Sequence, residues 1–209
     1  MLIKFDKSHP RRSALRLILG GGGLAADAWL PWSWAASTLE EPLTDAMRGV
    51  LGARVRAPLG TGPAGAEALD WQGQVLNVLG RWLPEPALRQ ELSAHLWYEA
   101  RRAGLSLSLV LGLIETESGF RKHAISPAGA MGYAQVMPFW TRLIGDGDAS
   151  ALFRTQPNLR YGCVILRHYL DQEKGDLTLA LGRYNGTRGQ WSYPQRVLEA
   201  ARRWRMSHD

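Results

Sequence analysis

The chain has 209 residues, of which 45% are hydrophobic, so it can build one good-sized core and at most a small appendage. Its formal net charge is +6, but residues 1–35 hold five Lys/Arg and two Asp/Glu, which leaves +3 for the remainder. A remainder this weakly basic does not call for nucleic acid, and we expect no nucleic-acid partner. The single cysteine, Cys163, excludes an internal disulfide and is predicted to lie buried in a helix.

Residues 1–35 have the pattern of an export signal. Several Lys/Arg precede an apolar, glycine-rich stretch over residues 17–26, and small residues up to Ala35 suit an export peptidase. Arg11 and Arg12 resemble the pair of a twin-arginine signal. We therefore predict a periplasmic protein, with the export route left open. An uncleaved membrane anchor is the alternative, but one aspartate and four glycines make a poor membrane-spanning helix.

Residues 36–87 are predicted to form an N-terminal extension without chemistry of its own. A short helix is expected over residues 43–51, followed by a Gly/Pro-rich linker over residues 52–65. Beyond the linker, leucines recur at helical spacing at Leu69, Leu76, Leu79 and Leu83, and two prolines end the pattern. We expect this second helix to pack against the rest of the chain.

Residues 88–209 are predicted to form the catalytic domain, which is mainly α. Apolar periodicity and stop signals predict helices over residues 88–103, 106–118, 135–144, 158–170, 177–183 and 194–205. Residues 121–132 and 145–148 are rich in turn signals and are expected to be irregular. No alternating strand pattern extends beyond a few residues, which excludes a large sheet.

Glu117 is the first candidate for a catalytic group. Ser106 can cap the start of its helix, the helix is apolar nearly all round, and Gly119 supplies a stop. Glu117 continues the stripe of Val110 and Ile114, so its carboxyl should lie at the lip of a cavity. Partial burial would raise its pKa from about 4.3 towards neutrality, which suits a general acid. The alternative is a solvated surface group, the usual state of a lone Glu at a helix end.

Three motifs follow one another along the sequence, beginning at the end of this helix: Glu117-Ser118, then Gly132-Tyr-Ala-Gln135 followed by Met137-Pro138, then Tyr184-Asn185. Together they resemble the catalytic domain of lytic transglycosylases, the soluble-lytic-transglycosylase family related to goose-type lysozyme. The resemblance implies a lysozyme-like helical domain with a glycan-binding cleft and at most minor β structure near that cleft.

The resemblance also implies a reaction. Peptidoglycan glycan strands would be the substrate, and the C6 hydroxyl of the muramoyl sugar would attack its own anomeric carbon. Glu117 would act as the single general acid and then base, giving a 1,6-anhydromuramoyl end without a cofactor or a metal. The 2-acetamido group of the sugar could stabilise the cationic centre, as in substrate-assisted glycosidases.

Six further residues are candidates for substrate binding or support: Ser118, Tyr133, Gln135, Tyr184, Asn185 and Trp191. By resemblance, Ser118 contacts the substrate or steadies Glu117, with helix capping as the alternative. Gln135 can bind an acetamido group, with a surface glutamine as the alternative. The Tyr184 hydroxyl can hold the Glu117 carboxyl, and Asn185 can bind backbone or substrate. Tyr133 and Trp191 offer ring faces to sugars.

The chain departs from the family pattern around these motifs. Tyr133 and Ala134 replace Leu and Met, and Gly186-Thr187 replaces Ala-Gly after the Tyr-Asn pair. Arg183 stands in place of Ala and would lower the pKa of Glu117 if the two paired, so we expect Arg183 to point away.

Two other functions are left open. One is a non-catalytic peptidoglycan-binding or assembly protein. The other is a hydrolytic lysozyme, which would require Asp146 or Asp148 to face Glu117 across a water molecule, although a turn role is expected for both. We expect a monomer. General wall turnover and service to a secretion, pilus or conjugation apparatus are both compatible with the sequence.

Overall fold

The structure is a computed structural model, which describes residues 45, 47–49, 51 and 63–209. The predicted export signal over residues 1–35 and residues 52–62 of the predicted linker lie outside the described residues. The last residues predicted for the linker, 63–65, are helical instead. The short helix expected over residues 43–51 is confirmed where it is described, because residues 45, 47–49 and 51 are helical.

The described chain is mainly α, as predicted. In chain order it forms α2 (Pro63–Leu79), α3 (Pro86–Arg102), α4 (Leu107–Ser118), α5 (Phe139–Ile144), the 3₁₀ helix η2 (Ala149–Phe153), α6 (Thr155–Gln172), α7 (Leu177–Asn185) and α8 (Ser192–Arg203). The β structure of this part is limited to two isolated antiparallel bridges, which pair Met131 with Ile125 and with Val136. No helix among the described residues is long and apolar enough to cross a membrane.

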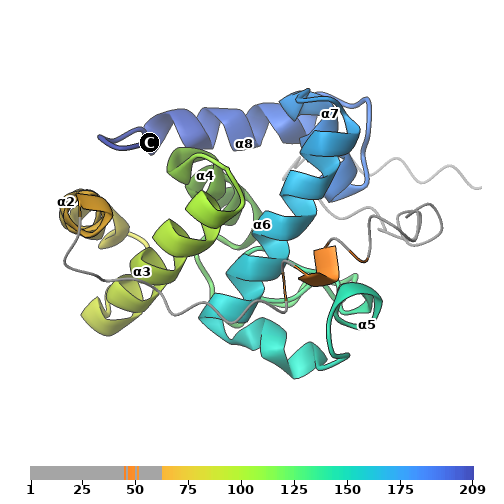
Figure 1. The fold of residues 1–209 in the computed structure, drawn as a ribbon, viewed down its shortest axis with the longest axis horizontal. Helices are drawn as coiled ribbons and strands as arrows, with labels where there is room; N and C mark the ends of the chain where they lie inside the picture. Colours follow the sequence, from red (N-terminus) through yellow and green to blue (C-terminus); the bar gives the residue numbers. More distant parts are fainter. Residues whose placement is uncertain (1–44, 46, 50, 52–62) are drawn as a thin grey trace, which may run out of the picture.

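Helix α4 is buried, and α8 lies across it (Figure 1). The Ser106 hydroxyl accepts a hydrogen bond from the backbone N–H of Leu109 at 3.2 Å, and Gly119 ends the helix in the left-handed conformation with φ of 56°. Gly112 lets the two helices approach closely, because a Cβ there would lie 2.5 Å from the backbone N of Ala201. The predicted cap and stop are confirmed.

Helix α2 shares one hydrophobic core with the rest of the described chain, as predicted for packing of this segment. Trp71, Val75 and Leu79 form its buried face, and the Trp71 ring lies 5.6 Å from that of Trp97 in α3. The predicted leucine face is wrong at Leu69, which is 61% exposed. Trp71 and Val75 are buried instead, because α3 contacts the side of α2 on which they lie.

The segment before α5 differs from the prediction. A helix was expected from Gln135, but residues 135–138 are not helical and α5 begins at Phe139. Gln135 has a φ of 48°, and Met131 and Val136 exchange two backbone hydrogen bonds that close a tight turn. A helix cannot pass through this turn, because Gln135 has left-handed backbone geometry and Pro138 lacks an N–H donor.

Candidate active site

Glu117 lies in the last turn of α4 with its side chain turned into the protein. It is 9% exposed, so most of the water around its carboxyl has been removed. Desolvation disfavours the charged form and raises the pKa of Glu117 to about 7, against the lowering effects of a hydrogen bond and a cation. The predicted direction of this shift is confirmed, and the surface alternative is contradicted by the burial.

Tyr193, at the start of α8, donates its phenolic hydrogen to Oε1 of Glu117. The tyrosine is 3% exposed, and burial, followed by the charge of Glu117, raises the pKa of its hydroxyl well above the usual range. The hydroxyl therefore stays protonated and remains a donor at every pH near neutrality. Tyr193 is not among the predicted partners of Glu117, because no local pattern near Tyr193 points to this contact.

Tyr184, at the end of α7, is fully buried in the same region. Its hydroxyl donates to the backbone oxygen of Ala134 at 2.8 Å, and burial, followed by the charge of Glu117, raises its pKa well above the usual range. We predicted that Tyr184 would hold the Glu117 carboxyl. Tyr193 donates to Glu117 and Tyr184 joins α7 to the turn that holds Ala134, so a contact of Tyr184 with the Glu117 carboxyl stays a prediction.

The Gly132-to-Gln135 turn is fixed by Asn158 of α6. The Asn158 side chain donates to Met131 O at 2.8 Å and to Leu152 O at 2.9 Å, and it accepts from Ala134 N at 2.8 Å. Gly132 has a φ of 76°, and a Cβ there would lie 2.3 Å from Nδ2 of Asn158. Glycine is therefore required at this position by both backbone geometry and space. Asn158 was not among the predicted site residues.

Gln135 is buried, which contradicts the surface alternative. Its Nε2 donates to Gly132 O at 2.9 Å and to Ala124 O at 3.2 Å, so both amide hydrogens hold the turn. Among the described residues its Oε1 has no hydrogen-bond partner. The carbonyl end of this side chain has no partner but is buried, so its contact with an acetamido group stays a prediction.

The remaining predicted residues differ in accessibility. Ser118 is buried and donates to Ile114 O at 3.2 Å within its own helix. Asn185 is half-buried and accepts from the Thr187 hydroxyl at 3.2 Å. Trp191, two residues before Tyr193, is 73% exposed and has a ring face free for contact.

Tyr133 requires a correction. It is 1% exposed, so its ring does not present a face to a sugar in this structure. Its hydroxyl is buried without a hydrogen-bond partner among the described residues, and burial raises its pKa to about 12. The large ring of Tyr133 packs in the hydrophobic core, although the residue follows Gly132 in the sequence.

The charged residues near the motifs form ion pairs or hydrogen bonds with residues other than Glu117. Arg183 pairs with Glu173, which Arg188 also contacts at 2.7 Å, so Arg183 points away from Glu117 as predicted. Asp148 caps η2 by accepting from Ser150 N at 2.9 Å, and Asp146 accepts from Asp148 N at 3.0 Å. The turn roles predicted for both aspartates are confirmed.

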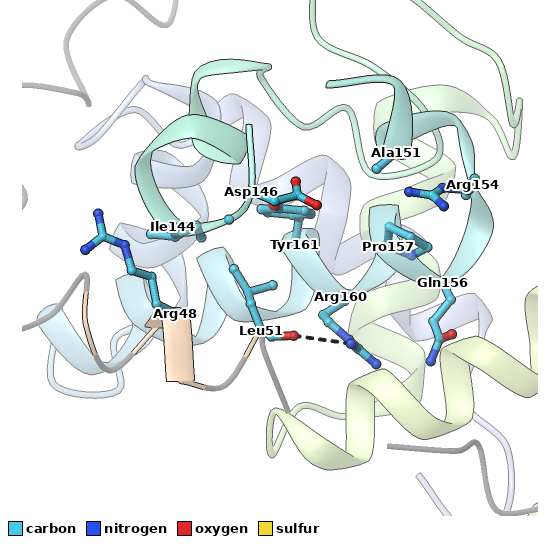
Figure 2. Close-up of a pocket in the computed structure, with 11 residues that line it drawn as sticks. Arg48, Leu51, Ile144, Asp146, Ala151, Arg154, Gln156, Pro157, Arg160 and Tyr161 are labelled. Atoms are coloured by element: carbon cyan, nitrogen blue, oxygen red, sulfur yellow. Dashed lines mark hydrogen bonds between the residues drawn. The ribbon is translucent and has the colours of Figure 1, made fainter. Parts of the chain in front are cut away.

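A pocket of about 450 Å³ lies between α6 and the loop that follows α5 (Figure 2). Arg48, Asp146, Arg154 and Tyr161 are among the residues that line it, and Glu117 is not. The guanidinium of Arg160 at its edge is occupied by the buried Glu99 at 2.9 Å and by Leu51 O at 3.3 Å. The predicted glycan-binding cleft at Glu117 is not this pocket and stays a prediction.

Comparison with protein families gives a match between residues 96–203 and the model described as "Transglycosylase SLT domain". A "Transglycosylase" of Enterobacteria phage PRD1 is 33% identical over 115 residues, which are 49% of this chain and 42% of the phage protein. A "Membrane-bound lytic murein transglycosylase C" of Glaesserella parasuis is 43% identical over 63 residues, covering 30% of this chain and 16% of that relative. The residues matched by the family model, 96–203, include both α4, which carries Glu117, and α8.

Among solved structures, an inactive mutant of the lytic transglycosylase Slt from Pseudomonas aeruginosa has the same fold, with a TM-score of 0.50 and 18% sequence identity. The likeness covers 80% of this chain and 37% of that chain. The chain spans less than half the length of each of these relatives.

Proposed function

This chain belongs to the transglycosylase SLT domain family, and from that premise we propose that it is a peptidoglycan lytic transglycosylase with Glu117 as its single general acid and base. The bond cleaved is the β-1,4 link between N-acetylmuramic acid and N-acetylglucosamine, and the product is a 1,6-anhydromuramoyl end. The observation that carries the proposal is the Glu117 carboxyl, buried in α4 and bound by Tyr193.

The environment of Glu117 suits an acid that works near neutral pH. With a pKa of about 7, roughly half of the carboxyls carry a proton at pH 7, whereas almost none would at the ordinary value. Tyr193 binds one carboxyl oxygen, which restricts the rotamer of the acid. A positioned acid of this kind contributes about 10²–10⁴-fold in rate.

The proton balance needs no second group. Glu117 gives its proton to the glycosidic oxygen as the bond from that oxygen to the anomeric carbon breaks. The C6 hydroxyl of the same muramoyl sugar then forms a bond to the anomeric carbon and gives its proton to Glu117. The carboxyl is protonated again at the end, and no water is consumed.

The surroundings of Glu117 favour this scheme over hydrolysis. Glycosidases that use two carboxylates hold them about 5–9.5 Å apart, and a second carboxylate so close would raise the pKa of the first. In the described part of the chain, the groups that shift the pKa of Glu117 are a tyrosine and an arginine, both of which lower it. Asp146 and Asp148 are engaged in their own turn.

The substrate and location are supported by the relatives. Several are described as membrane-bound lytic murein transglycosylases, which supports a murein substrate and an envelope location. We propose the envelope for this chain too, in agreement with the export signal predicted over residues 1–35. The monomeric state and the contact with a secretion, pilus or conjugation apparatus stay predictions.

The test is digestion of purified peptidoglycan with product analysis by mass spectrometry. Wild-type protein should release muropeptides one water lighter than hydrolysis products, with no reducing end. The Glu117→Gln variant should lose about 10²-fold or more of the rate while keeping its fold by circular dichroism. Products with free reducing ends would identify a hydrolase instead.

Glu115→Gln is a matched control for this substitution. Glu115 lies in the same helix, but it accepts from Arg203 at 2.5 Å and from the Trp204 indole at 2.5 Å, on another side of α4. The control should keep activity within a few-fold of wild type. Equal activity of Glu117→Gln and wild type would remove Glu117 from the mechanism.

A further inference from the structure

Arg196 lies one turn after Tyr193 on the same side of α8. Its guanidinium carbon is 5.8 Å from the centroid of the Tyr193 ring, within the range of a cation–π contact. The hydroxyl of that ring donates to Glu117. An exposed cation therefore lies next to the proposed acid, connected to it through a single tyrosine.

The charge of Arg196 works against the acid. A nearby cation favours the ionised carboxylate, and Arg196 lowers the pKa of Glu117 from the value that burial alone would give. The other groups that interact with Glu117 are the phenols of Tyr193 from α8 and Tyr184 from α7, which are neutral near pH 7. Arg196 is thus the one charged group acting on Glu117 in the described part of the chain.

No protein anion balances this cation among the described residues. Arg196 forms no salt bridge there, whereas Arg203 of the same helix pairs with Glu115. Glu199 lies three residues further along α8, but its carboxylate accepts from the Gln195 side chain at 2.9 Å. The guanidinium has its donors free for a ligand.

We propose that Arg196 binds a carboxylate of the glycan strand beside the bond to be cleaved, and so determines which strands the enzyme prefers. This inference rests on the proposed function. A guanidinium can bind a carboxylate through two parallel hydrogen bonds, which gives direction as well as attraction. The carboxylate comes from one of two sources: the free lactyl group of a muramoyl unit without a peptide, or the peptide stem.

Binding has a consequence for the proton on Glu117. Once a substrate carboxylate neutralises Arg196, the cation no longer favours the ionised form of Glu117. A strand that carries the carboxylate therefore increases the protonated fraction of the acid as it binds. Specificity and proton supply are coupled through the same side chain.

The test compares three preparations of glycan strands: strands with peptide stems, strands without stems that carry lactyl carboxylates, and strands whose carboxyl groups have been converted to methylamides. Arg196→Gln should lower kcat/KM by about 10- to 100-fold on the carboxylate-bearing strands that use this contact. At a pH well below 7, where Glu117 is protonated in both proteins, the same variant should equal wild type on the methylamide strands. Whichever carboxylate-bearing preparation shows the loss identifies the source.

Arg202→Gln is the matched control, because Arg202 is an exposed arginine of the same helix that neither pairs with a described carboxylate nor acts on Glu117. It should behave as wild type on all three preparations. Arg196→Lys keeps the charge without the planar fork and should recover part of the lost activity. In Arg196→Gln the alkaline limb of the kcat/KM profile should move to higher pH, because the pKa of free Glu117 rises.

Two results would overturn the inference. One is an equal loss for Arg196→Gln on methylamide and carboxylate-bearing strands, which would indicate a structural role. The other is no loss on any strand that the wild type cleaves. If the wild type cleaves none, the proposed function fails, and calorimetric binding of soluble strand fragments still tests Arg196. Tighter binding of carboxylate fragments by wild type than by Arg196→Gln would support the contact, and equal binding would refute it.

Discussion

The hydroxyl of Tyr193 and the carboxyl of Glu117 form a hydrogen bond between groups 76 residues apart in the sequence. The close packing of α8 on α4 through Gly112 makes this bond geometrically feasible. The bond stabilises the ionised form of Glu117, while burial of the same carboxyl favours the protonated form, and burial dominates. The balance of the two effects leaves the acid near neutrality.

Tyr193→Phe should move the pKa of Glu117 above about 7, because the hydrogen bond that lowers it is lost. An enzyme that needs a protonated Glu117 loses activity as pH rises through this pKa, so the alkaline limb of kcat/KM should shift upward. Without this hydrogen bond the Glu117 carboxyl is less well positioned, which should lower kcat about tenfold or more. The measurement is a pH–rate profile on glycan strands.

Tyr169→Phe is the control, since the Tyr169 hydroxyl is buried without a hydrogen-bond partner among the described residues. It removes the same atom from another buried tyrosine and should leave the profile in place. An unchanged alkaline limb in Tyr193→Phe would contradict the assigned role of the hydrogen bond.

Glu117 should make the folded state less stable as pH rises. Its folded pKa of about 7 lies above the ordinary value of 4.5, so the folded state retains the proton that the unfolded chain has released. Its contribution is fully present below pH 4.5 and is lost as pH rises through 7. The whole change is about 3 kcal/mol, from 1.4 kcal/mol per pKa unit.

Glu117→Gln removes this titration. Relative to wild type, the variant should gain about 3 kcal/mol in free energy of unfolding between pH 4.5 and pH 8. Urea unfolding of both proteins across that range measures the difference. A difference that stays constant with pH would mean that Glu117 titrates normally.

Gly132→Ala should destabilise the protein by about 3 kcal/mol or more, because strain at a positive φ adds to a clash with Asn158 and Leu152. Gly129 offers a matched comparison, since its φ of 86° is similar but a Cβ there meets nothing within 4 Å. Gly129→Ala should therefore cost about 1 kcal/mol, from backbone strain alone. Equal losses in denaturant unfolding would show that crowding by Asn158 is unimportant.

Gly112→Ala should push α8 away from α4, because the new Cβ would meet backbone atoms of Ala201 at 2.5 Å and Val197 at 2.7 Å. Backbone cannot rotate aside as a side chain can, so we expect a loss of about 2–3 kcal/mol and reduced activity through Tyr193. In α2, a Cβ on Gly73 meets nothing within 4 Å. Gly73→Ala should instead stabilise by about 0.5–1 kcal/mol, by helix propensity. Stability of Gly112→Ala at or above that of wild type would contradict the close packing.

The sequence by itself determined the helix that carries Glu117. Its cap at Ser106, its stop at Gly119 and its apolar surface depend on neighbours within a few residues, so periodicity and capping rules find them. The raised pKa of Glu117 follows from the same burial. The mainly α fold class was also predictable from the sequence, because the helical pattern recurs along residues 88–209.

Tertiary structure alone decided which groups meet. Tyr193 donates to Glu117, Asn158 fixes the turn before α5, and Tyr133 packs into the core, because each contact joins segments that only helix packing brings together. Gln135 leaves the predicted helix because its turn is held by backbone partners up to eleven residues away. Local rules describe the conformation of a segment, whereas the partner of a buried polar group depends on the whole fold.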